Sequence, residues 1–350
     1  MAVHRLSLSE FLSLSRERPV LDVRSPGEYI HAHIPGAVSL PLFSDEERKE
    51  VGTTYKQKSR EHAIKIGLDF FGPKMRGMVE TVESLLRKGN FIHGKEILVH
   101  CWRGGMRSGA VAWLLDLYGF KVFTLEGGYK AFRNHVLNVF ARDHDIRLLG
   151  GYTGSGKTEV LREMKKRGAV VIDLELLASH KGSAFGAIGQ PPQPSQEMFE
   201  NRLATELELY SGSTIWMEDE SQRIGKLNIP HSLWATIRRK PVLFLDIPFE
   251  ERLKFIIEGY GMLDRERLLN SIIRISKRLG PLETKTAVNF LLEDNTRDCF
   301  DILLKYYDKL YDKALLNREV PPQLNKLDSS CVDTISNTEK VLQCESVSFS

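Results

Sequence analysis

Short apolar runs alternate with longer amphipathic stretches along the first 140 residues. The runs at 19–24, 37–42, 96–100 and 121–125 are bounded by charged residues or by Gly and Pro, which predicts buried strands. The stretches between them have the composition of helices, as in the charged segment 44–89. Strands interleaved with helices predict a parallel sheet with helices on both faces.

A second series of strands and helices begins near residue 146, after a helix expected over 129–142. Its predicted strands are 146–150, 169–173, 214–218 and 241–246. The Gly-, Pro- and Gln-rich stretch 181–196 is long for a structureless loop inside a domain, which favours a functional role. The pattern of 251–316 is helical.

These patterns predict an α/β protein with two parallel-sheet domains. The first spans 1–140, with a helical insertion at about 44–89, and the second spans 141–320. After Pro321-Pro322 the chain is rich in Ser and loses its periodicity, so 321–350 is expected to be a disordered tail.

Composition excludes several classes of protein. Of the 350 residues, 42% are hydrophobic and 27% are charged, which is typical of a folded globular chain rather than a disordered one. There is no apolar run of about 18 residues and no apolar leader, so a cytoplasmic protein without a membrane span is expected. Four cysteines without a CxxC pair fit a reducing compartment. A net charge of +3 is compatible with nucleic-acid binding without requiring it.

The segment 100–108, His-Cys-Trp-Arg-Gly-Gly-Met-Arg-Ser, follows a predicted strand and opens a predicted helix. Backbone N–H groups in such a loop surround an anion. Together with the helix N-terminus and the charges of Arg103 and Arg107, they are expected to lower the pKa of Cys101 and make it a thiolate nucleophile.

This loop resembles the active loop of rhodanese domains, and segments 22–29 and 33–37 are similar to the N-terminal signatures of that family. The similarity covers about 5–137. The C-x5-R spacing is one residue longer than in common rhodaneses and resembles cysteine-dependent phosphatases. A longer loop forms a wider anion-binding cavity, which would admit a phosphate-sized group.

Residues 151–158, Gly-Tyr-Thr-Gly-Ser-Gly-Lys-Thr, fit the phosphate-loop motif G-x4-G-K-[ST] between a strand and a helix. In this motif backbone N–H groups wrap a diphosphate, the lysine neutralises its outer oxygens and the threonine ligates Mg²⁺. The expected phosphate-binding residues are Gly151, Gly154, Ser155, Gly156, Lys157 and Thr158, the last also a magnesium ligand.

Further polar residues lie where a phosphate site could use them. Asp173, Glu218 and Asp219 end or follow predicted strands and are candidates to hold a metal-bound water. The candidates to close over phosphates as a lid, or to contact RNA, are Arg252, Arg274 and Arg278.

A rhodanese-like domain directly ahead of a P-loop domain, together with segments 183–186, 193–196 and 218–221, resembles the tRNA 2-selenouridine synthase family from about residue 5 to 320. The resemblance implies a transferase that acts on tRNA wobble uridine (U34) and replaces the sulfur of 2-thiouridine by selenium. It implies two steps, in which geranyl diphosphate first alkylates the sulfur and selenium from selenophosphate then displaces the S-geranyl group. An enzyme that supplies selenophosphate is an expected partner.

Under this resemblance each loop has a separate task. The P-loop with Lys157 and Mg²⁺ would stabilise the departing diphosphate. Cys101 would attack the selenium of selenophosphate and carry it, while Arg103 and Arg107 hold the phosphate.

Two alternatives use the same motifs. One is a cysteine-dependent phosphatase or sulfurtransferase fused to a P-loop small-molecule kinase. The other is a nucleotide-switched adaptor whose rhodanese domain only binds, which the presence of Cys101 disfavours.

Overall fold

The computed structural model describes residues 3–89, 94–260, 265–316, 318 and 324–348. The chain divides into two compact units, the N-terminal unit (Met1–Val139) and the P-loop unit (Phe140–Ser350). Among the described residues, no helix combines the length and the apolar character needed to cross a membrane.

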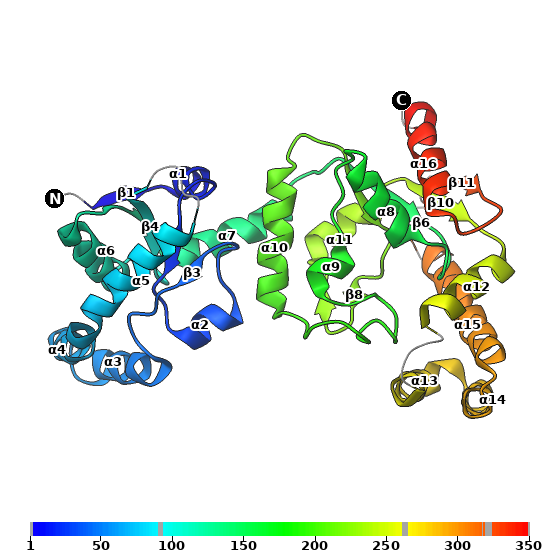
Figure 1. Ribbon diagram of the computed structural model, residues 1–350, viewed down its shortest axis with the longest axis horizontal. Helices are drawn as coiled ribbons and strands as arrows, with labels where there is room; N and C mark the ends of the chain where they lie inside the picture. The colour runs from blue at the N-terminus through cyan, green and yellow to red at the C-terminus, as the bar shows by residue number, and fades with distance from the viewer. Residues whose placement is uncertain (1–2, 90–93, 261–264, 317, 319–323, 349–350) are drawn as a thin grey trace. The chain divides into compact units, whose positions relative to one another are not determined.

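The N-terminal unit is built on a five-stranded parallel sheet with strand order β1-β5-β4-β2-β3 (Figure 1). In chain order its elements are β1 (His4–Leu6), α1 (Leu8–Leu14), β2 (Val20–Asp22), α2 (Pro26–His31), β3 (Val38–Ser39), α3 (Asp45–Gln57), α4 (Arg60–Phe71), a 3₁₀ helix (Gly72–Lys74), α5 (Met75–Lys88), β4 (Glu96–His100), α6 (Met106–Tyr118), β5 (Lys121–Leu125) and α7 (Gly128–Val139).

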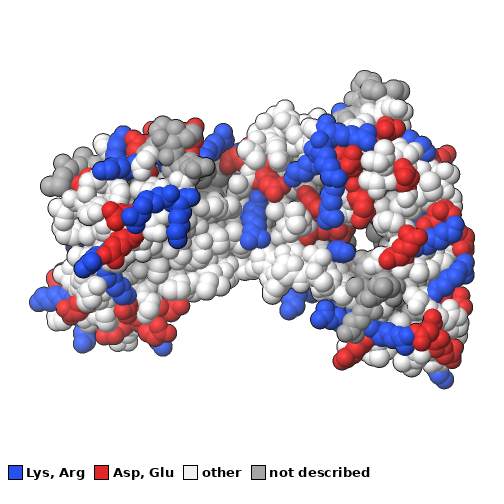
Figure 2. All heavy atoms as spheres, viewed as in Figure 1, with Lys and Arg blue, Asp and Glu red and all other residues white. Residues whose placement is uncertain are grey.

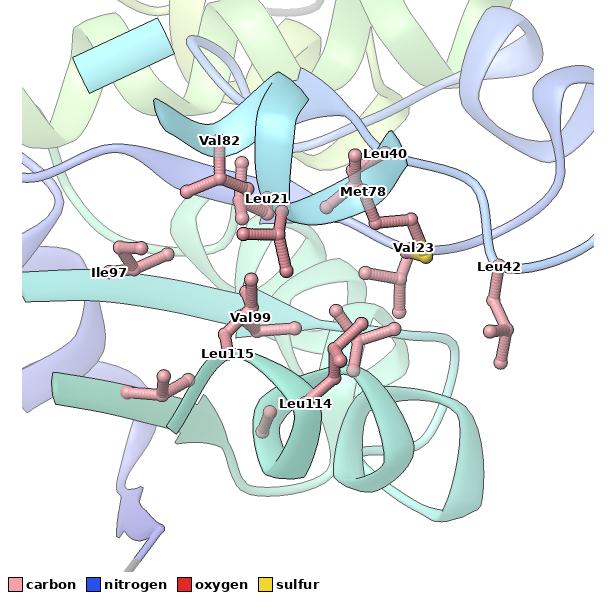
Figure 3. Packing of buried hydrophobic residues seen from close by; sticks show 14 of the residues in the cluster. Leu21, Val23, Leu40, Leu42, Met78, Val82, Ile97, Val99, Leu114 and Leu115 are labelled. Carbon is pink, nitrogen blue, oxygen red and sulfur yellow. The ribbon is translucent and has the colours of Figure 1, made fainter. Parts of the chain in front are cut away.

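Helices cover both faces of this sheet, so four of the five residues in each of its strands β4 and β5 are buried. Side chains alternate along β4, and Ile97 and Val99 point to the face where they pack with Leu115 of α6 and with Met78 and Val82 of α5 (Figure 3). Helices α1 and α7 cover the opposite face. There the buried ring of His100 meets the edge of Phe11 and stacks with Tyr129, at centroid distances of 6.3 and 6.4 Å.

The P-loop unit contains a four-stranded parallel sheet of order β11-β10-β6-β7 and a separate antiparallel pair, β8-β9. Its elements are β6 (Ile146–Gly150), α8 (Lys157–Lys166), α9 (Leu174–Ala178), α10 (Gln196–Leu209), β7 (Ile215–Glu218), β8 (Arg223–Ile224), β9 (Leu227–Asn228), α11 (His231–Ile237), β10 (Val242–Asp246), α12 (Phe249–Tyr260), α13 (Arg265–Leu279), α14 (Pro281–Leu292), α15 (Thr296–Leu316), β11 (Leu324–Asp328) and α16 (Thr334–Ser348).

Two hydrophobic clusters stabilise this unit. One lies under α8 and joins the sheet to Val341 of α16. The other lies among α12–α15, drawn in yellow to orange in Figure 1, and includes Ile256, Ile272 and Leu303. The helical pattern predicted for 251–316 therefore corresponds to four helices with a core of their own, apart from residues 261–264, which lie outside the described residues.

The expected disordered tail is wrong for residues 324–348. Strand β11 pairs in parallel with β10 at the edge of the sheet, and α16 packs with Val341 fully buried. Polar residues of this segment satisfy each other, as in the 2.5 Å hydrogen bond from Ser329 Oγ to Asn337 Oδ1. A Ser-rich composition here accompanies buried, paired hydroxyl and amide groups rather than disorder.

The predicted strand 169–173 is reduced to a single bridge between Val171 and Trp216. Asp173 already accepts a hydrogen bond from the Leu176 N–H at 2.8 Å and caps α9, so the chain turns into a helix before it can extend the sheet.

Candidate active site

Cys101 directly follows β4 and lies in a loop that packs closely against Gly128, the first residue of α7. Its carbonyl oxygen accepts a 2.8 Å hydrogen bond from the N–H of Tyr129, and the Trp102 carbonyl accepts one from Lys130 at 2.9 Å. At Gly128, where φ is +58°, a Cβ would lie 2.4 Å from the Cys101 oxygen. Only glycine fits at this position, and the close approach fixes the shape of the cysteine loop.

The environment of Cys101 favours the thiolate. Only 3% of the residue is exposed, and its Sγ lies 3.3 Å from the Oγ of Ser108. Burial raises the pKa of the thiol, but hydrogen bonds from the Ser108 side chain and from the backbone of Ser108 and Gly105, followed by the charge of Arg107, hold the net pKa below its ordinary value. The loop therefore favours the thiolate form of Cys101.

The two loop arginines have different surroundings. Arg103 is exposed, whereas Arg107 donates to Glu28 at 2.6 Å, and Arg48 lies 3.5 Å from the same carboxylate. Burial opposes the charge of Glu28, but the hydrogen bonds and charge of Arg107, with smaller help from Ser25 and Arg48, lower its pKa to about 2. The guanidinium of Arg107 is thus paired with the carboxylate of Glu28, whereas Arg103 faces solvent.

His100 precedes the nucleophile but is not placed to activate it. It is fully buried on the opposite face of β4, and burial lowers its pKa to about 4, so it is neutral at pH 7. The hydrogen bonds and the charge that favour the thiolate come instead from Gly105 in the loop and from Ser108 and Arg107 of α6.

The P-loop, residues 151–158, connects β6 to α8 as its motif requires. Gly151, Gly154 and Gly156 have φ values of 146°, 83° and 74°, which disfavour other residues. Ser155 is fully buried, and its hydroxyl has no hydrogen-bond partner among the described residues.

Lys157 and Thr158 face a group of acids. Lys157 Nζ lies 3.3 Å from Glu218 Oε1 and donates to the carbonyl of Gly151 at 3.0 Å. Thr158 Oγ1 donates to Glu218 at 3.0 Å and lies 3.4 Å from Glu175. Glu218, a candidate to hold a metal-bound water, therefore lies beside both Lys157 and Thr158.

Three carboxylates, from Glu175, Glu218 and Glu220, have oxygens within 4.8 Å of one another. Burial and mutual repulsion raise the pKa of Glu175 and of Glu220 above the usual range. Oxygen ligands beside a P-loop threonine are the donor set that Mg²⁺ prefers, and a cation there would relieve the repulsion.

Family models match nearly the whole chain. One described as the tRNA 2-selenouridine synthase AAA domain matches residues 144–341, and one described as a rhodanese-like domain matches residues 7–135. A Nitrosomonas europaea protein named tRNA 2-selenouridine synthase is 35% identical over 294 residues, 81% of this chain and 74% of that protein. The chain belongs to the tRNA 2-selenouridine synthase family. A Marinobacter nauticus protein of the same name is 33% identical over 338 residues, 86% of this chain and 89% of that protein.

Among solved structures, the N-terminal domain of a Clostridium difficile 630 protein is 39% identical and covers 39% of this chain and 99% of its own, with a TM-score of 0.35. Together with the two parallel sheets, the family models confirm the predicted α/β fold, a rhodanese-like domain followed by a P-loop domain. The AAA-domain match of this family reaches residue 341, so it includes β11 and part of α16.

Three residues proposed for the phosphate site have other partners in this member of the family. Asp173 caps α9 and lies 3.5 Å from Arg162. Asp219 accepts from Tyr311 at 2.8 Å and from Arg318 at 2.5 Å, so it is held away from Thr158. Arg252 is buried and binds Asp308 and the Thr153 carbonyl, which makes it a support of the P-loop rather than a lid.

A cleft of about 2080 Å³ opens beside the P-loop, and the face drawn in Figure 2 is hollowed in this unit. Arg274 and Arg278 of α13 are exposed and line it, and their role as lid residues or RNA contacts stays a prediction. The other basic residues of its lining are Lys157, Arg162, Lys181, Arg223, Lys226, Arg238, Arg239, Lys277 and Arg318.

Sequence reasoning missed Glu28 and Glu175 as site residues. Glu175 comes from the five-residue helix α9 and meets Thr158 only through the fold. The sequence did indicate a functional role for the loop 181–196. Gly182 of this loop lies against two acids of the site, because a Cβ there would lie 2.9 Å from Glu220 and 3.1 Å from Glu175.

Proposed function

We propose that this protein converts wobble 2-thiouridine in tRNA to 2-selenouridine, by S-geranylation with geranyl diphosphate and then selenation with selenophosphate. One observation carries the proposal: a single chain has a complete P-loop with Lys157 and Thr158 and, in another unit, a buried Cys101 whose pKa is lowered. These are two anion sites suited to different chemistry.

In the first step the sulfur of thiouridine attacks the allylic carbon of geranyl diphosphate. The new S–C bond forms, the C–O bond breaks, diphosphate leaves with the electron pair and the base loses its N3 proton. The loop amides and Lys157 supply positive charge where the leaving diphosphate gains negative charge. Alkylation also makes the sulfur a better leaving group for the second step.

Thr158, Glu175, Glu218 and Glu220 would hold Mg²⁺ in this unit. The ion would neutralise part of the charge of the diphosphate when both are bound. Exposed basic residues that line the cleft, among them Arg223, Arg239 and Arg274, would face the phosphates of the tRNA.

In the second step we assign the attack of Cys101 to the phosphorus of selenophosphate. Selenium there already has the oxidation state of selenide, so the Cys–Se bond expected from the sequence would need an oxidant. Attack at phosphorus forms an S–P bond, breaks the P–Se bond and releases hydrogen selenide with the electron pair; water then hydrolyses the S–P bond. Arg103 and the loop amides would bind the phosphoryl group.

Hydrogen selenide then adds to C2 of the geranylated base, and geranyl thiolate leaves with the C–S electron pair. A selenophosphate-supplying enzyme would deliver the donor. Thiouridine tRNA incubated with the protein, Mg²⁺ and geranyl diphosphate should yield geranylthiouridine, and subsequent selenophosphate should yield selenouridine, both read by mass spectrometry of nucleosides. Absence of both products with folded protein would reject the proposal.

A further inference from the structure

One wall of the P-loop cleft is apolar. It is formed by three helices of the P-loop unit, α12, α13 and α15, and we call it the apolar wall. Its members are Phe255, Ile256, Ile275, Tyr306, Tyr307 and Leu310.

The wall begins at the P-loop itself. A Cβ placed on Gly154 would lie 2.8 Å from Cγ1 of Ile256, so the α12 side chain touches the phosphate loop. On α15, positions 306, 307 and 310 follow the helical period and face the same cleft. A ligand whose diphosphate is bound by the P-loop therefore has this wall next to the rest of the molecule.

The wall is backed by packed side chains rather than by solvent. Ile256 belongs to the cluster among α12–α15, against which Ile275, Tyr306 and Tyr307 are packed. The hydroxyl of Tyr307 already accepts from the N–H of Ala184 at 3.3 Å, which leaves the ring as its contribution to the cleft. Leu310 is 39% exposed, so apolar surface remains open to a ligand.

The cleft is larger than one small substrate requires. Its volume of about 2080 Å³ exceeds the roughly 300–1,000 Å³ of ordinary small-molecule pockets. Arg223, Arg238 and Arg239, which come from outside the three helices of the wall, also line it, as do Arg274, Lys277 and Arg278 of α13. One cleft therefore offers an apolar region, a diphosphate loop and a basic region suited to a polyanion.

We propose that the apolar wall binds the hydrocarbon chain of the allylic diphosphate and that this contact selects a prenyl diphosphate over inorganic diphosphate and nucleotides. The inference rests on the proposed function and assigns its first substrate to particular residues. Each buried methylene adds affinity, so binding should tighten from inorganic diphosphate to the C5 dimethylallyl and then the C10 geranyl diphosphate.

The test is calorimetric titration of the full chain with these three ligands and ATP, each with Mg²⁺. The wild type should bind geranyl diphosphate at least about tenfold more tightly than inorganic diphosphate or ATP. Leu310→Glu places a charge against the chain, so it should lose about tenfold or more of the geranyl affinity, and Leu310→Ala a smaller part. Neither change should alter the affinity for inorganic diphosphate, which also reports that the P-loop is folded.

The matched control is Leu282→Glu, at a 72% exposed leucine of α14 outside the cleft lining, which should bind all ligands as the wild type does. Geranylation of tRNA is measured in parallel. If the wild type geranylates tRNA while Leu310→Glu keeps the wild-type affinity and KM for geranyl diphosphate, the wall is wrong and the proposed function stands. If the wild type binds geranyl diphosphate no more tightly than inorganic diphosphate and transfers no geranyl group, both are wrong.

Discussion

The cysteine loop of the N-terminal unit and the P-loop have the same local architecture and opposite electrostatics. Each connects the end of a buried parallel strand to the start of a helix, β4 to α6 and β6 to α8, and each has glycines where the backbone requires them. In the first, Glu28, an acid distant in sequence, pairs with Arg107, and hydrogen bonds from Ser108 and Gly105 favour the thiolate of Cys101. In the second, acids crowd around Lys157 and Thr158.

Under the proposed function, the cysteine loop carries its own negative charge as a thiolate, whereas the P-loop site binds the negative charge of a ligand together with a cation. The cysteine loop lowers the pKa of its nucleophile, so the negative charge belongs to the protein. Around the P-loop burial and repulsion raise the pKa of two carboxyl groups, so the site gains most from a cation. If the two loops do different chemistry, changes in each should be separable.

The largest effect is expected at Cys101. Cys101→Ala removes the nucleophile, so selenation should fall by about 10⁴-fold or more, while geranylated tRNA should still form and accumulate. Mass spectrometry of wobble nucleosides reads both species. Because the cysteine serves to release selenide, added hydrogen selenide should restore selenation of geranylated tRNA. Loss of geranylation in a folded Cys101→Ala protein would contradict the separation of the two loops.

The second effect is expected at Lys157. Lys157→Ala removes the charge that faces the departing diphosphate and should slow geranylation by about 10²–10³-fold, measured from single-turnover rates. Supplying geranylated tRNA directly should restore selenation, since the cysteine loop is unchanged. Lys166→Ala is the control, because that lysine is exposed at the other end of α8 and pairs with Glu163 at 3.2 Å. Geranylation by Lys157→Ala at the wild-type rate would show that the P-loop lysine takes no part in this reaction.

The strands that position both loops could be predicted from sequence because each is a short apolar run with a clear end. The strands β2, β4, β5, β6, β7 and β10 all lie within predicted runs, whereas β1, of three residues, was not predicted. Strand β11 alternates exposed and half-buried residues at a sheet edge and has the polar composition of a loop. Edge strands depend on their neighbours, so composition alone did not reveal it.

Within the sites, residues inside a motif were predicted and residues brought by the fold were not. Cys101, Lys157 and Thr158 come with fixed local spacing. Glu28 reaches Arg107 across 79 positions, and Glu218 reaches Thr158 across 60. Such pairs are formed by the tertiary fold, which also explains why Asp219, next to Glu218, faces Tyr311 instead.

A third, smaller effect concerns stability. The folded pKa of Glu28 is about 2 and its ordinary value is 4.5, so its ion pair stabilises the N-terminal unit above about pH 4.5 and loses that contribution as the pH falls toward 2. Glu28→Gln should therefore cost on the order of 2–3 kcal/mol at pH 7 and about half of that near pH 3. Urea titration of the full chain, with hydrogen exchange of α6 peptides, measures this. Glu80→Gln, in the exposed pair with Arg76, should leave the stability nearly unchanged at either pH.

The smallest effect distinguishes two explanations of the thiolate. The sequence attributes it to loop N–H groups, the helix N-terminus and the charges of Arg103 and Arg107. In the structure Arg107 is paired with Glu28, and the side chain of Ser108 lies 3.3 Å from the sulfur. Ser108→Ala should therefore raise the pKa of Cys101 and slow its alkylation at pH 7 by about two- to tenfold, and Arg107→Met should have a weaker effect in the same direction. Iodoacetamide rates measured against pH give the midpoint for each variant, with Ser9→Ala as an exposed serine control. A larger shift from Arg107→Met than from Ser108→Ala would mean that charge, rather than the hydrogen bonds of the loop, makes Cys101 a nucleophile.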